Sequence, residues 1–471
     1  MRSFQKTFFL HAPVWLQNTF VSLYGLKIDR TRYGGAYKNY FKAVYTQYGY
    51  DNSALQSFMN ERLMSTINNA LVDIPYYKDT LKYHGIHIGD IRSIEDIERL
   101  PFLEKDVVRR EPDRLVSNKY DRNSLLCIHT TGTTGTPLNI YCTPQVRQLN
   151  YAYYDRFLLM SDIKYEGKRA TFGGRIIVHE AQQKPPFWRY SSFQKNLLFS
   201  SYHLTDENMP AYIEKLIDFN PDVIDAYPSS LFAVASYAEA HHIDLRQVTS
   251  GITTSAETLF PAQRQTIEAV FGVPVRDQYG AAEMCVFVGQ CKEGSYHIHT
   301  DYGMLEFLRD DGSKAMPGEE AELVCTGFIN PVMPLIRYRM GDRGVLSDKF
   351  CMCGSIFPVM EKIMGRMDDV IVTPDGRRIG RLSPVFKGFP VKEVQYIQRN
   401  IGTVEVQIVK DIGYSISLEG EVLKELRKRL GETISIHINY VNSISRGRGG
   451  KLKSIVSYVE EKNQKFDANY P

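Results

Sequence analysis

The sequence predicts an α/β protein with a large N-terminal part and a small α+β unit at the C-terminus. From Ser124 to Gln278, strand-like and helical segments alternate, which is typical of largely parallel sheets. Between Met304 and Cys325 a hairpin pattern replaces this alternation, and toward the C-terminus strand signals surround one charged helix. The chain of 471 residues is long enough for about three domain-sized units.

A helix is predicted over residues 52–73, because Leu55, Met59 and Leu63 recur at helical spacing and Pro75 follows as a stop. Thr205 is expected to cap a second helix, because Asp and Glu follow it in the first turn. In chain order, the further elements expected up to Gln278 are strands 125–128 and 138–141, helix 145–160, helix 205–219, strand 222–226, a helix from Ser229 or Ser230 to His241, strand 252–254, helix 261–271 and strand 274–278.

The second half of the chain departs from this rhythm. Residues 304–308 and 320–325 are predicted to form a hairpin around a turn at Asp310–Gly312, and a third subregion is expected to begin there. In the C-terminal unit, Gly431 is expected to end the charged helix. The elements expected in this unit are strands 404–409, 414–418 and 434–440 and a helix over 422–430.

The composition is that of an ordinary folded protein, with 43% hydrophobic and 24% charged residues. The net charge is only +3 and the basic residues form no long run, so we expect no nucleic-acid partner. No stretch approaches ~20 apolar residues, so we expect no membrane span. Because Lys6, His11 and Pro13 interrupt the apolar residues at the start, a secretory signal is not expected. We therefore expect a cytoplasmic protein with a sticky N-terminal surface.

The segment Thr130–Pro137, which reads TTGTTGTP, concentrates hydroxyls and glycines between two predicted strands. Glycines let backbone N–H groups approach an anion closely, and threonine hydroxyls add donors without a charge that competes with magnesium. These features predict a phosphate-binding loop. It is not the P-loop of common NTPases, because GxxxxGK[ST] is absent and a strand, not a helix, follows. A mobile polar turn is the alternative for the loop taken alone.

Three further segments accompany this loop in a fixed order: 277–283 (DQYGAAE), 338–342 (YRMGD) and 365–369 (GRMDD). Together the four segments resemble the adenylate-forming superfamily, in particular the branch of phenylacetate-coenzyme A ligases and their relatives in capsular polysaccharide biosynthesis. The resemblance extends from about Ser124 to the C-terminus. It implies a large N-terminal adenylate-forming domain of α/β subdomains and a β-rich subdomain, at residues 1–365, and a small mobile α+β domain at 366–471.

The resemblance also implies the nucleotide site. Thr130, Thr131, Gly132, Thr133, Thr134 and Gly135 would hold the phosphates of ATP, with Thr134 taking part in catalysis, while Thr136 stands where many relatives have Lys. Tyr279, followed by Gly280, would stack on adenine, and Glu283 would reach magnesium, for which a hard oxygen ligand is suited. The other implied contacts are Ala256 and Glu257 along the adenine, Asp342 on the ribose hydroxyls, and Arg366 toward the nucleotide.

The glycine-rich segment 445–453 resembles the loop that carries the family's adenylation lysine, and Lys451 is the matching residue. A carboxylate that attacks the α-phosphate is repelled by it, and a cation between the two anions lowers that barrier. Lys453, Arg448 and Arg446 are the neighbouring alternatives, and a solvated basic loop is the non-catalytic one. Asp368 matches the hinge about which the small domain would turn.

A zinc site is also predicted. Seven cysteines do not indicate a secreted disulfide framework, so metal binding or plain burial is expected for them. Cys351 and Cys353 form a tight thiolate pair, and Cys291 and His297 supply two more ligands of the kind zinc prefers. Relatives in the phenylacetate-coenzyme A ligase branch often carry such Cys/His pairs. His299 is the alternative to His297, and a closed site of this kind would be structural.

The resemblance implies that ATP and a carboxylic acid give an acyl-adenylate and pyrophosphate, after which the acyl group passes to a nucleophile. Phe172, Arg175 and Tyr227 are the candidates for the acyl pocket, with a core Phe and a surface Arg as the alternative. The opening stretch with RYGG at 32–35 favours an amine or a sugar precursor as acceptor in polysaccharide biosynthesis. Coenzyme A is the alternative acceptor, and a non-catalytic nucleotide-binding scaffold is the alternative to an enzyme. A zinc hydrolase is disfavoured, because four protein ligands leave no position for water.

Overall fold

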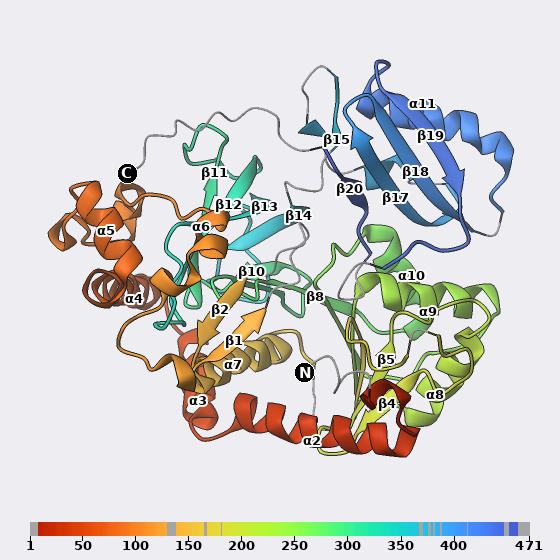
Figure 1. The fold of residues 1–471 in the computed structure, drawn as a ribbon, viewed down its shortest axis with the longest axis horizontal. Coiled ribbons are helices and arrows are strands. Elements are labelled where there is room, and N and C mark those ends of the chain that lie inside the picture. The colour runs from red at the N-terminus through yellow and green to blue at the C-terminus, as the bar shows by residue number, and fades with distance from the viewer. Residues whose placement is uncertain are drawn as a thin grey trace. The chain divides into compact units, whose positions relative to one another are not determined.

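The computed structural model describes residues 8–129, 138–163, 167–179, 181–366, 371–374, 378–379, 382–386, 389–411, 413–446 and 452–459. The chain divides into two compact units, and the boundary lies between Met364 and Gly365, near the end of strand β14 (Val359–Arg366). Figure 1 shows the helices and strands of both units, coloured from red at the N-terminus to blue at the C-terminus. A large first unit of sheets and helices and a separate C-terminal unit confirm the predicted fold class.

The first unit opens with a series of helices. The predicted helix 52–73 is confirmed at both ends as α4, because the Asp51 carboxylate accepts a hydrogen bond from the Ala54 amide at 2.8 Å and α5 starts at Pro75. Leu63 and Ile67 of α4 are fully buried. The helices of this region are α2 (Val14–Tyr33), α3 (Tyr37–Tyr48), α4 (Asn52–Asp73), α5 (Pro75–Tyr83) and α6 (Lys105–Arg110).

A twelve-stranded sheet forms the centre of the first unit. Its order is β11-β12-β13-β14-β10-β9-β8-β7-β6-β3-β5-β4, and β5, β3, β6, β7 and β8 are parallel neighbours, as the alternation of strands and helices predicted. The bounds are β3 (Arg169–Gly173), β4 (Trp188–Ser191), β5 (Asn196–Ser200), β6 (Val223–Ala226), β7 (Gly251–Ser255), β8 (Val275–Gly280), β9 (Phe287–Gln290), β10 (Tyr296–Ile298), β11 (Gly303–Leu308), β12 (Glu320–Gly327) and β13 (Tyr338–Leu346).

The predicted hairpin is confirmed as β11 and β12, which pair antiparallel. This hairpin belongs to the same sheet as the parallel strands. Strands β9 to β14 form the antiparallel half of that sheet. Strands β1 (Leu126–His129) and β2 (Asn139–Cys142), on either side of the Gly/Thr loop, form a separate antiparallel pair. The expected third subregion is therefore a change of strand direction within one sheet.

Four helices occur between strands of the first unit: α7 (Pro144–Met160), α8 (Met209–Phe219), α9 (Pro228–Ala240) and α10 (Pro261–Phe271). The prediction that Thr205 caps α8 is wrong, because the helix begins at Met209 after Asn208. Pro210 occupies the first turn of α8, where its missing N–H costs no hydrogen bond. For the same reason α9 begins at Pro228, before the predicted serine cap.

The second unit is a four-stranded sheet with one helix. Its order is β19-β18-β17-β20, and the helix α11 (Glu419–Leu430) buries Val422, Leu426 and Leu430 in the core of this unit. Strand β17 was not predicted. The strands are β15 (Ile371–Val372), β16 (Arg378–Ile379), β17 (Val391–Asn400), β18 (Thr403–Lys410), β19 (Ser435–Tyr440) and β20 (Ile455–Ser457).

The strand predicted at 414–418 is wrong. Residues Ile416–Leu418 form a 3₁₀ turn that leads into α11, and the Ser415 hydroxyl accepts a hydrogen bond from the Ser417 amide at 3.3 Å. Ser side chains favour such local bonds over strand pairing. Among the described residues, no helix is both long and apolar enough to cross a bilayer.

Candidate active site and metal centre

The predicted ligand-binding residues of the first unit lie after parallel strands. Tyr227 follows β6, Ala256 and Glu257 follow β7, and Tyr279 and Gly280 end β8. Because β6, β7 and β8 run parallel, their carboxyl ends lie along one edge of the sheet. Open α/β sheets bind their ligands at this edge. The topology thus gathers residues that are up to 53 positions apart in the sequence.

Asp342 comes to Tyr279 from the antiparallel half of the sheet. It lies in β13, and its Oδ2 accepts a hydrogen bond of 2.7 Å from the Tyr279 hydroxyl. The same hydroxyl lies 3.6 Å from the sulfur of Met340. Burial, and then the negative charge of Asp342, raise the pKa of Tyr279 well above its ordinary value, so its hydroxyl stays a donor. The aromatic ring and the carboxylate predicted for adenine and ribose are therefore joined directly.

The end of β8 is held by a residue for which the sequence predicted no role. Asp277 is buried; its Oδ1 accepts a hydrogen bond of 2.6 Å from Thr254 of β7, and its Oδ2 one of 2.7 Å from Tyr296 of β10. Its backbone amide donates to Gln290 of β9 at 2.9 Å. Burial raises the pKa of Asp277 to about 6. Asp277 thus ties β8 to three other strands two residues before Tyr279, and its place in the DQYG segment was the only signal.

Glu283 and Glu257 lie in different surroundings. Glu283 is 7% exposed and occupies the turn between β8 and β9. Ala256 has a φ of +71°, which directs the chain after β7 into the left-handed region. One carboxylate oxygen of Glu257 accepts a hydrogen bond of 3.0 Å from the Ser229 amide, in the first turn of α9. Glu257 therefore caps a helix whose N-terminus lies at the same edge of the sheet.

The acyl-pocket candidates meet through the backbone. The Tyr227 amide donates a 2.9 Å hydrogen bond to the Phe172 carbonyl, so both residues lie at the carboxyl ends of neighbouring strands. The Phe172 ring is fully buried and stacks on Phe199 with a centroid distance of 4.5 Å. Arg175 is exposed, and its guanidinium lies 5.8 Å from the ring centroid of Tyr24 in α2.

Several predicted residues lie outside the described part of the chain. These are the phosphate loop, with Thr130, Thr131, Gly132, Thr133, Thr134 and Gly135, and also Asp368 and Lys451. Arg366 is described only as the last residue of β14. Of the alternatives to Lys451, Arg446 pairs with Glu393 inside the second unit.

A second group of predicted residues forms a compact cluster. Cys291, His297, Cys351 and Cys353 bring their ligand atoms within 4.8 Å of one another. The Cys291 and Cys351 sulfurs are 3.6 Å apart, and the Cys353 sulfur lies 3.2 Å from His297 Nε2. Ligands at ~2.3 Å from a tetrahedral zinc ion would be ~3.8 Å apart. Three thiols and one imidazole at this spacing fit a zinc ion.

The elements around the cluster hold its ligands in place. Cys291 follows β9, His297 lies in β10, and the turn with Cys351 and Cys353 ends at Gly354, whose φ of +79° favours glycine. His297 Nδ1 donates to the Phe357 carbonyl at 2.9 Å, and this hydrogen bond orients the ring so that Nε2 faces the thiols.

His299, the alternative ligand, belongs to another network. Its Nδ1 accepts a 2.7 Å hydrogen bond from Arg156, whose guanidinium also pairs with buried Asp301, and its ring stacks on Phe357. Burial, and then the charge of Arg156, hold the pKa of His299 well below its ordinary value. The structure therefore selects His297 for the cluster.

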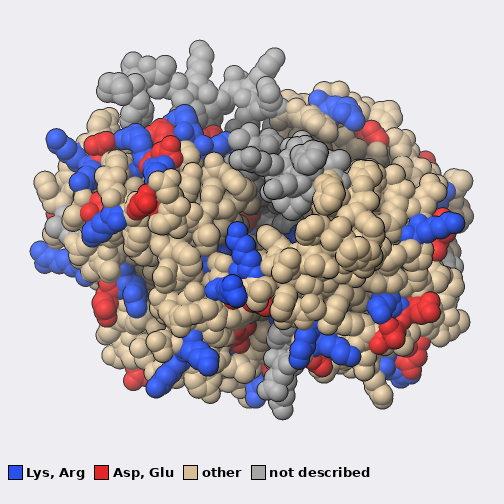
Figure 2. All heavy atoms as spheres, turned by 60° about the horizontal axis from the view of Figure 1, so that its bottom comes forward, with Lys and Arg blue, Asp and Glu red and all other residues tan. Residues whose placement is uncertain are grey.

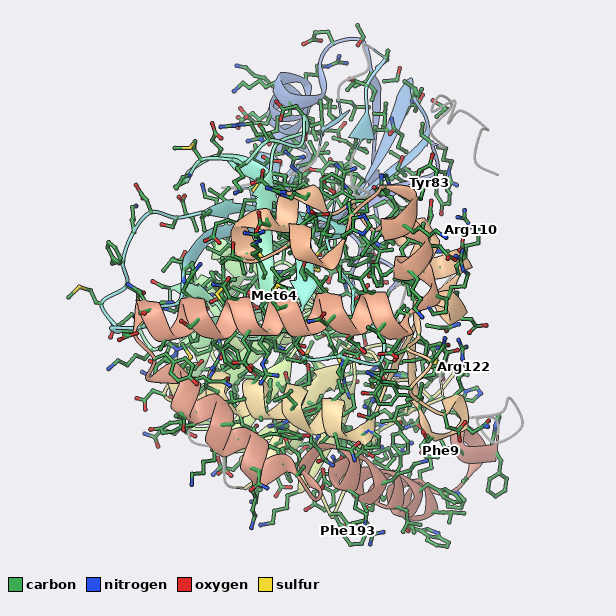
Figure 3. The ribbon with its side chains drawn as sticks, turned by 90° about the vertical axis from the view of Figure 1, so that its left-hand side faces the viewer. Phe9, Met64, Tyr83, Arg110, Arg122 and Phe193 are labelled. Atoms are coloured by element: carbon green, nitrogen blue, oxygen red, sulfur yellow. The ribbon has the colours of Figure 1, made fainter. Side chains whose placement is uncertain are left out.

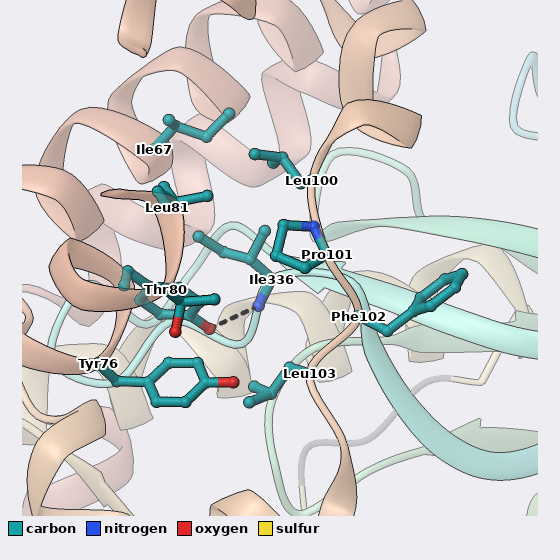
Figure 4. Close-up of a pocket in the computed structure, with 10 residues that line it drawn as sticks. Ile67, Tyr76, Thr80, Leu81, Leu100, Pro101, Phe102, Leu103 and Ile336 are labelled. Carbon is teal, nitrogen blue, oxygen red and sulfur yellow. Dashed lines mark hydrogen bonds between the residues drawn. The ribbon is translucent and has the colours of Figure 1, made fainter. Parts of the chain in front are cut away.

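Two hollows of the first unit lie away from these residues. One is an apolar cavity of about 10 Å³ between α4, α5 and residues 100–103, where the Tyr77 hydroxyl accepts a hydrogen bond from the Ile336 amide at 3.0 Å (Figure 4). It holds at most one water molecule. The other, of about 650 Å³, lies between α3, α4 and α7. None of the predicted site residues that the structure describes lines either hollow.

Comparison with known proteins agrees with this geometry. The family model described as the CapK C-terminal domain matches residues 371–458. Protein CapK of Staphylococcus aureus is 28% identical over 96% of this chain and 98% of its own length. The phenylacetate-coenzyme A ligase of Thermus thermophilus is 23% identical over 85% of this chain and 96% of its own length. A crystal structure of 2-hydroxyisobutyryl-CoA ligase with a bound acyl-adenylate has a TM-score of 0.70 at 17% identity, over 87% of this chain and 91% of that one.

The chain thus shares its fold with a solved acyl-adenylate-bound CoA ligase, and it is similar in sequence to ligases over most of its length. These similarities support the phenylacetate-coenzyme A ligase-like branch of the adenylate-forming superfamily, which the four sequence segments also resemble.

Proposed function

We propose that this protein uses ATP to activate a carboxylic acid and then transfers the acyl group to an amine or a sugar-linked acceptor in surface polysaccharide biosynthesis. The observation that carries the proposal is the hydrogen bond between Tyr279 and Asp342 at the carboxyl edge of the parallel strands. An aromatic face suits a purine, and a carboxylate with two acceptor oxygens suits a ribose diol. The pair thus presents both halves of an adenosine site.

In the first proposed step, an oxygen of the substrate carboxylate attacks the α-phosphorus of ATP. The bond to the bridging oxygen of the β-phosphate breaks, pyrophosphate leaves, and an acyl-adenylate remains. We assign the phosphates to Thr130–Gly135, magnesium to Glu283, and the cation between the two repelling anions to Lys451. In the second step the acceptor nucleophile attacks the acyl carbon, loses a proton, and AMP leaves with the electrons of the acyl–oxygen bond.

The second unit has a separate part in this proposal. We assign residues 366–471 to the small domain that delivers Lys451, and Asp368 to the hinge about which that domain turns. Ala256, Glu257, Gly280 and Arg366 complete the nucleotide contacts, and Arg175 and Tyr227 lie toward the acyl group. We propose a cytoplasmic location, because the reaction consumes ATP.

We further propose that Cys291, His297, Cys351 and Cys353 hold a structural zinc ion. The spacing of the donor atoms supports this assignment. Four protein ligands leave no position for a reacting water molecule, so the ion would cross-link β9, β10 and the turn at 351–354.

The acceptor is argued from the relatives. The resemblance of the sequence segments to the capsular polysaccharide branch favours an acceptor of that pathway, and similarity to Protein CapK over nearly the whole chain supports the choice of branch. Relatives named phenylacetate-coenzyme A ligases favour coenzyme A as the alternative acceptor, with a thioester as product. The third candidate function is a non-catalytic nucleotide-binding scaffold. Such a scaffold would have no use for an adenylation lysine.

The decisive experiment measures pyrophosphate release from ATP and magnesium with aryl acids, fatty acids, amino acids and hydroxy acids, with and without coenzyme A. A response to one acid that coenzyme A does not change supports an amine or sugar acceptor. Acceleration by coenzyme A supports the thioester ligase, and silence with ATP bound supports the scaffold.

The lysine assignment has its own test. Lys451→Ala should abolish acyl-adenylate formation while ATP binding, measured by calorimetry, persists. Lys453→Ala, two residues away in the same segment, is the matched control and should keep adenylation. If Lys453→Ala abolishes adenylation and Lys451→Ala keeps it, Lys453 is the adenylation lysine.

A further inference from the structure

Helix α2 buries mostly small and polar residues and exposes several large apolar ones. Its buried residues are Gln17, Val21, Ser22 and Gly25, of which only one is a large hydrophobe. The largest exposed apolar side chain of the helix is Trp15, at 68% exposure. Four further large apolar side chains of α2 are exposed: Phe20 by 37%, Leu23 by 54%, Tyr24 by 56% and Tyr33 by 38%. A surface helix of a soluble protein ordinarily shows the opposite arrangement.

Specific contacts hold α2 in this orientation. Asn18 Oδ1 accepts a 3.0 Å hydrogen bond from the Tyr190 amide, and the Ser22 hydroxyl accepts one of 3.0 Å from the Ser192 amide. Gln17 donates to the Ala12 carbonyl at 2.8 Å. A Cβ on Gly25 would lie 2.3 Å from the Ser191 hydroxyl, so only glycine permits this approach to the β4 region. These contacts fix the inward face of α2 against the β4 region. The opposite face of the helix therefore lies on the surface of the first unit.

Neighbouring side chains extend the apolar face. Phe8 is 55% exposed and lies edge-on to Phe20, with ring centroids 6.3 Å apart. Phe193, also 55% exposed, lies in the turn after β4, between Ser192 and Gln194, which both bond to α2. Figure 3 shows Phe193 at the lower edge of the molecule, and Figure 2, which brings the underside of Figure 1 forward, shows a wide uncharged area between scattered charged side chains.

The exposed charged residues on the outer face of α2 are basic. Lys27 and Arg30 are exposed on the same half of α2 as the apolar residues, and neither has an ion pair with any described residue. The only acidic residue of α2 is Asp29, whose carboxylate accepts a hydrogen bond from Gln194 at 2.9 Å. The outer face therefore combines aromatic and aliphatic side chains with the positive charges of Lys27 and Arg30.

We propose that the outer face of α2, together with Phe8 and Phe193, docks this protein on a membrane surface that contains anionic lipid. Trp, Phe, Tyr and Leu beside Lys and Arg are typical of helices that lie in the headgroup region. The lipid charge complements Lys27 and Arg30, and a protein partner would need its own acidic, apolar groove. A helix of 20 residues is about 30 Å long, and lying flat it would anchor the protein without crossing the bilayer.

The test is co-sedimentation of the full chain with two kinds of vesicle, phosphatidylcholine alone and equal parts phosphatidylcholine and phosphatidylglycerol. We expect binding to the anionic vesicles, weakened by salt, and little binding to phosphatidylcholine. In a Trp188→Phe background, Trp15 is the remaining tryptophan, and its emission should shift to the blue when vesicles are added.

Variants separate the two components of binding. Trp15→Ser with Leu23→Ser should abolish binding to the anionic vesicles, and Lys27→Glu should weaken that binding about fivefold or more at low salt. Tyr83→Ser is the matched control, because Tyr83 is a 66% exposed aromatic residue on α5 (Figure 3). It should bind as the unchanged protein does.

Two results would overturn the proposal. One is equal vesicle binding by the Trp15/Leu23 variant and the unchanged protein. The other is absence of vesicle binding, in which case sedimentation velocity shows what covers the face. A dimer that Leu23→Glu dissociates would assign the outer face of α2 to a second copy of the chain.

Discussion

The Tyr279 hydroxyl and Asp342 Oδ2 are 2.7 Å apart, and this hydrogen bond joins the last parallel strand of the sheet to strand β13. The two residues are 63 positions apart in the sequence. Because the hydroxyl proton is directed at the carboxylate, each side chain limits the rotation of the other. An adenine-stacking ring and a ribose-binding carboxylate would then be set in place before the nucleotide arrives.

Tyr279→Phe should therefore weaken ATP binding although the aromatic face remains. The loss of one hydrogen bond to a charged group, about 1 kcal/mol, corresponds to an increase of about fivefold in the Kd for ATP. Asp342→Ala should raise the Kd further, because the ribose ligand itself is removed. Calorimetric titration with ATP measures both variants without knowledge of the acid. In the double variant the two losses should be less than additive, and full additivity would show that the hydrogen bond does not couple the residues.

Glu257→Ala should destabilise the N-terminus of α9. The carboxylate accepts a hydrogen bond from the Ser229 amide, and removal of such a cap costs about 1 kcal/mol. Glu257→Gln keeps an acceptor oxygen and should lose less. Urea denaturation compares these variants with Glu239→Ala, an exposed glutamate near the other end of the same helix. Equal losses from Glu257→Ala and Glu239→Ala would rule out the capping role.

Chelation should lower the melting temperature of the protein and release one zinc ion per chain. Cys291→Ser, which removes one of four clustered ligands, should reproduce that loss of stability. Cys127→Ser is the matched control, because Cys127 is exposed and outside the cluster. Elemental analysis gives the metal content, and cobalt substitution should produce a thiolate-to-metal absorption band. A purified protein that holds no metal and ignores chelators would contradict the assignment.

Asp277 should make the protein less stable as the pH rises. Burial raises its pKa from 3.8 to about 6, so the folded state keeps a proton that the unfolded state has lost. Between about pH 4 and pH 6 the free energy of unfolding should therefore fall with increasing pH, by on the order of 3 kcal/mol from this group. Asp277→Asn should flatten the dependence, as seen in denaturation curves across this range. Asp244→Asn, at an exposed carboxylate, should leave the slope unchanged.

Local signals explain why much of the fold was predictable. Asp51 caps α4 and Pro75 starts the next helix, so both ends of α4 followed from residues close in sequence. The wrong strand at 414–418 shows the limit of such signals. Its apolar residues have the composition of a strand, but the Ser415 side chain bonds locally and Ile416 is 66% exposed. Whether such a segment forms a strand depends on whether β18 has a free edge for it. That edge is taken by β19, and the choice of neighbour is not encoded in the segment itself.

The sequence by itself determined the class of protein, because the order of its phosphate, adenine and ribose segments is local information that needs no folded chain to be read. It also named the four candidate zinc ligands. Only the tertiary structure chose His297 over His299, since both imidazoles lie in the same strand region and their distinction depends on which one meets Arg156 and which meets the cysteines. The outward apolar face of α2 was likewise decided in three dimensions, by hydrogen bonds to a strand more than 160 residues away.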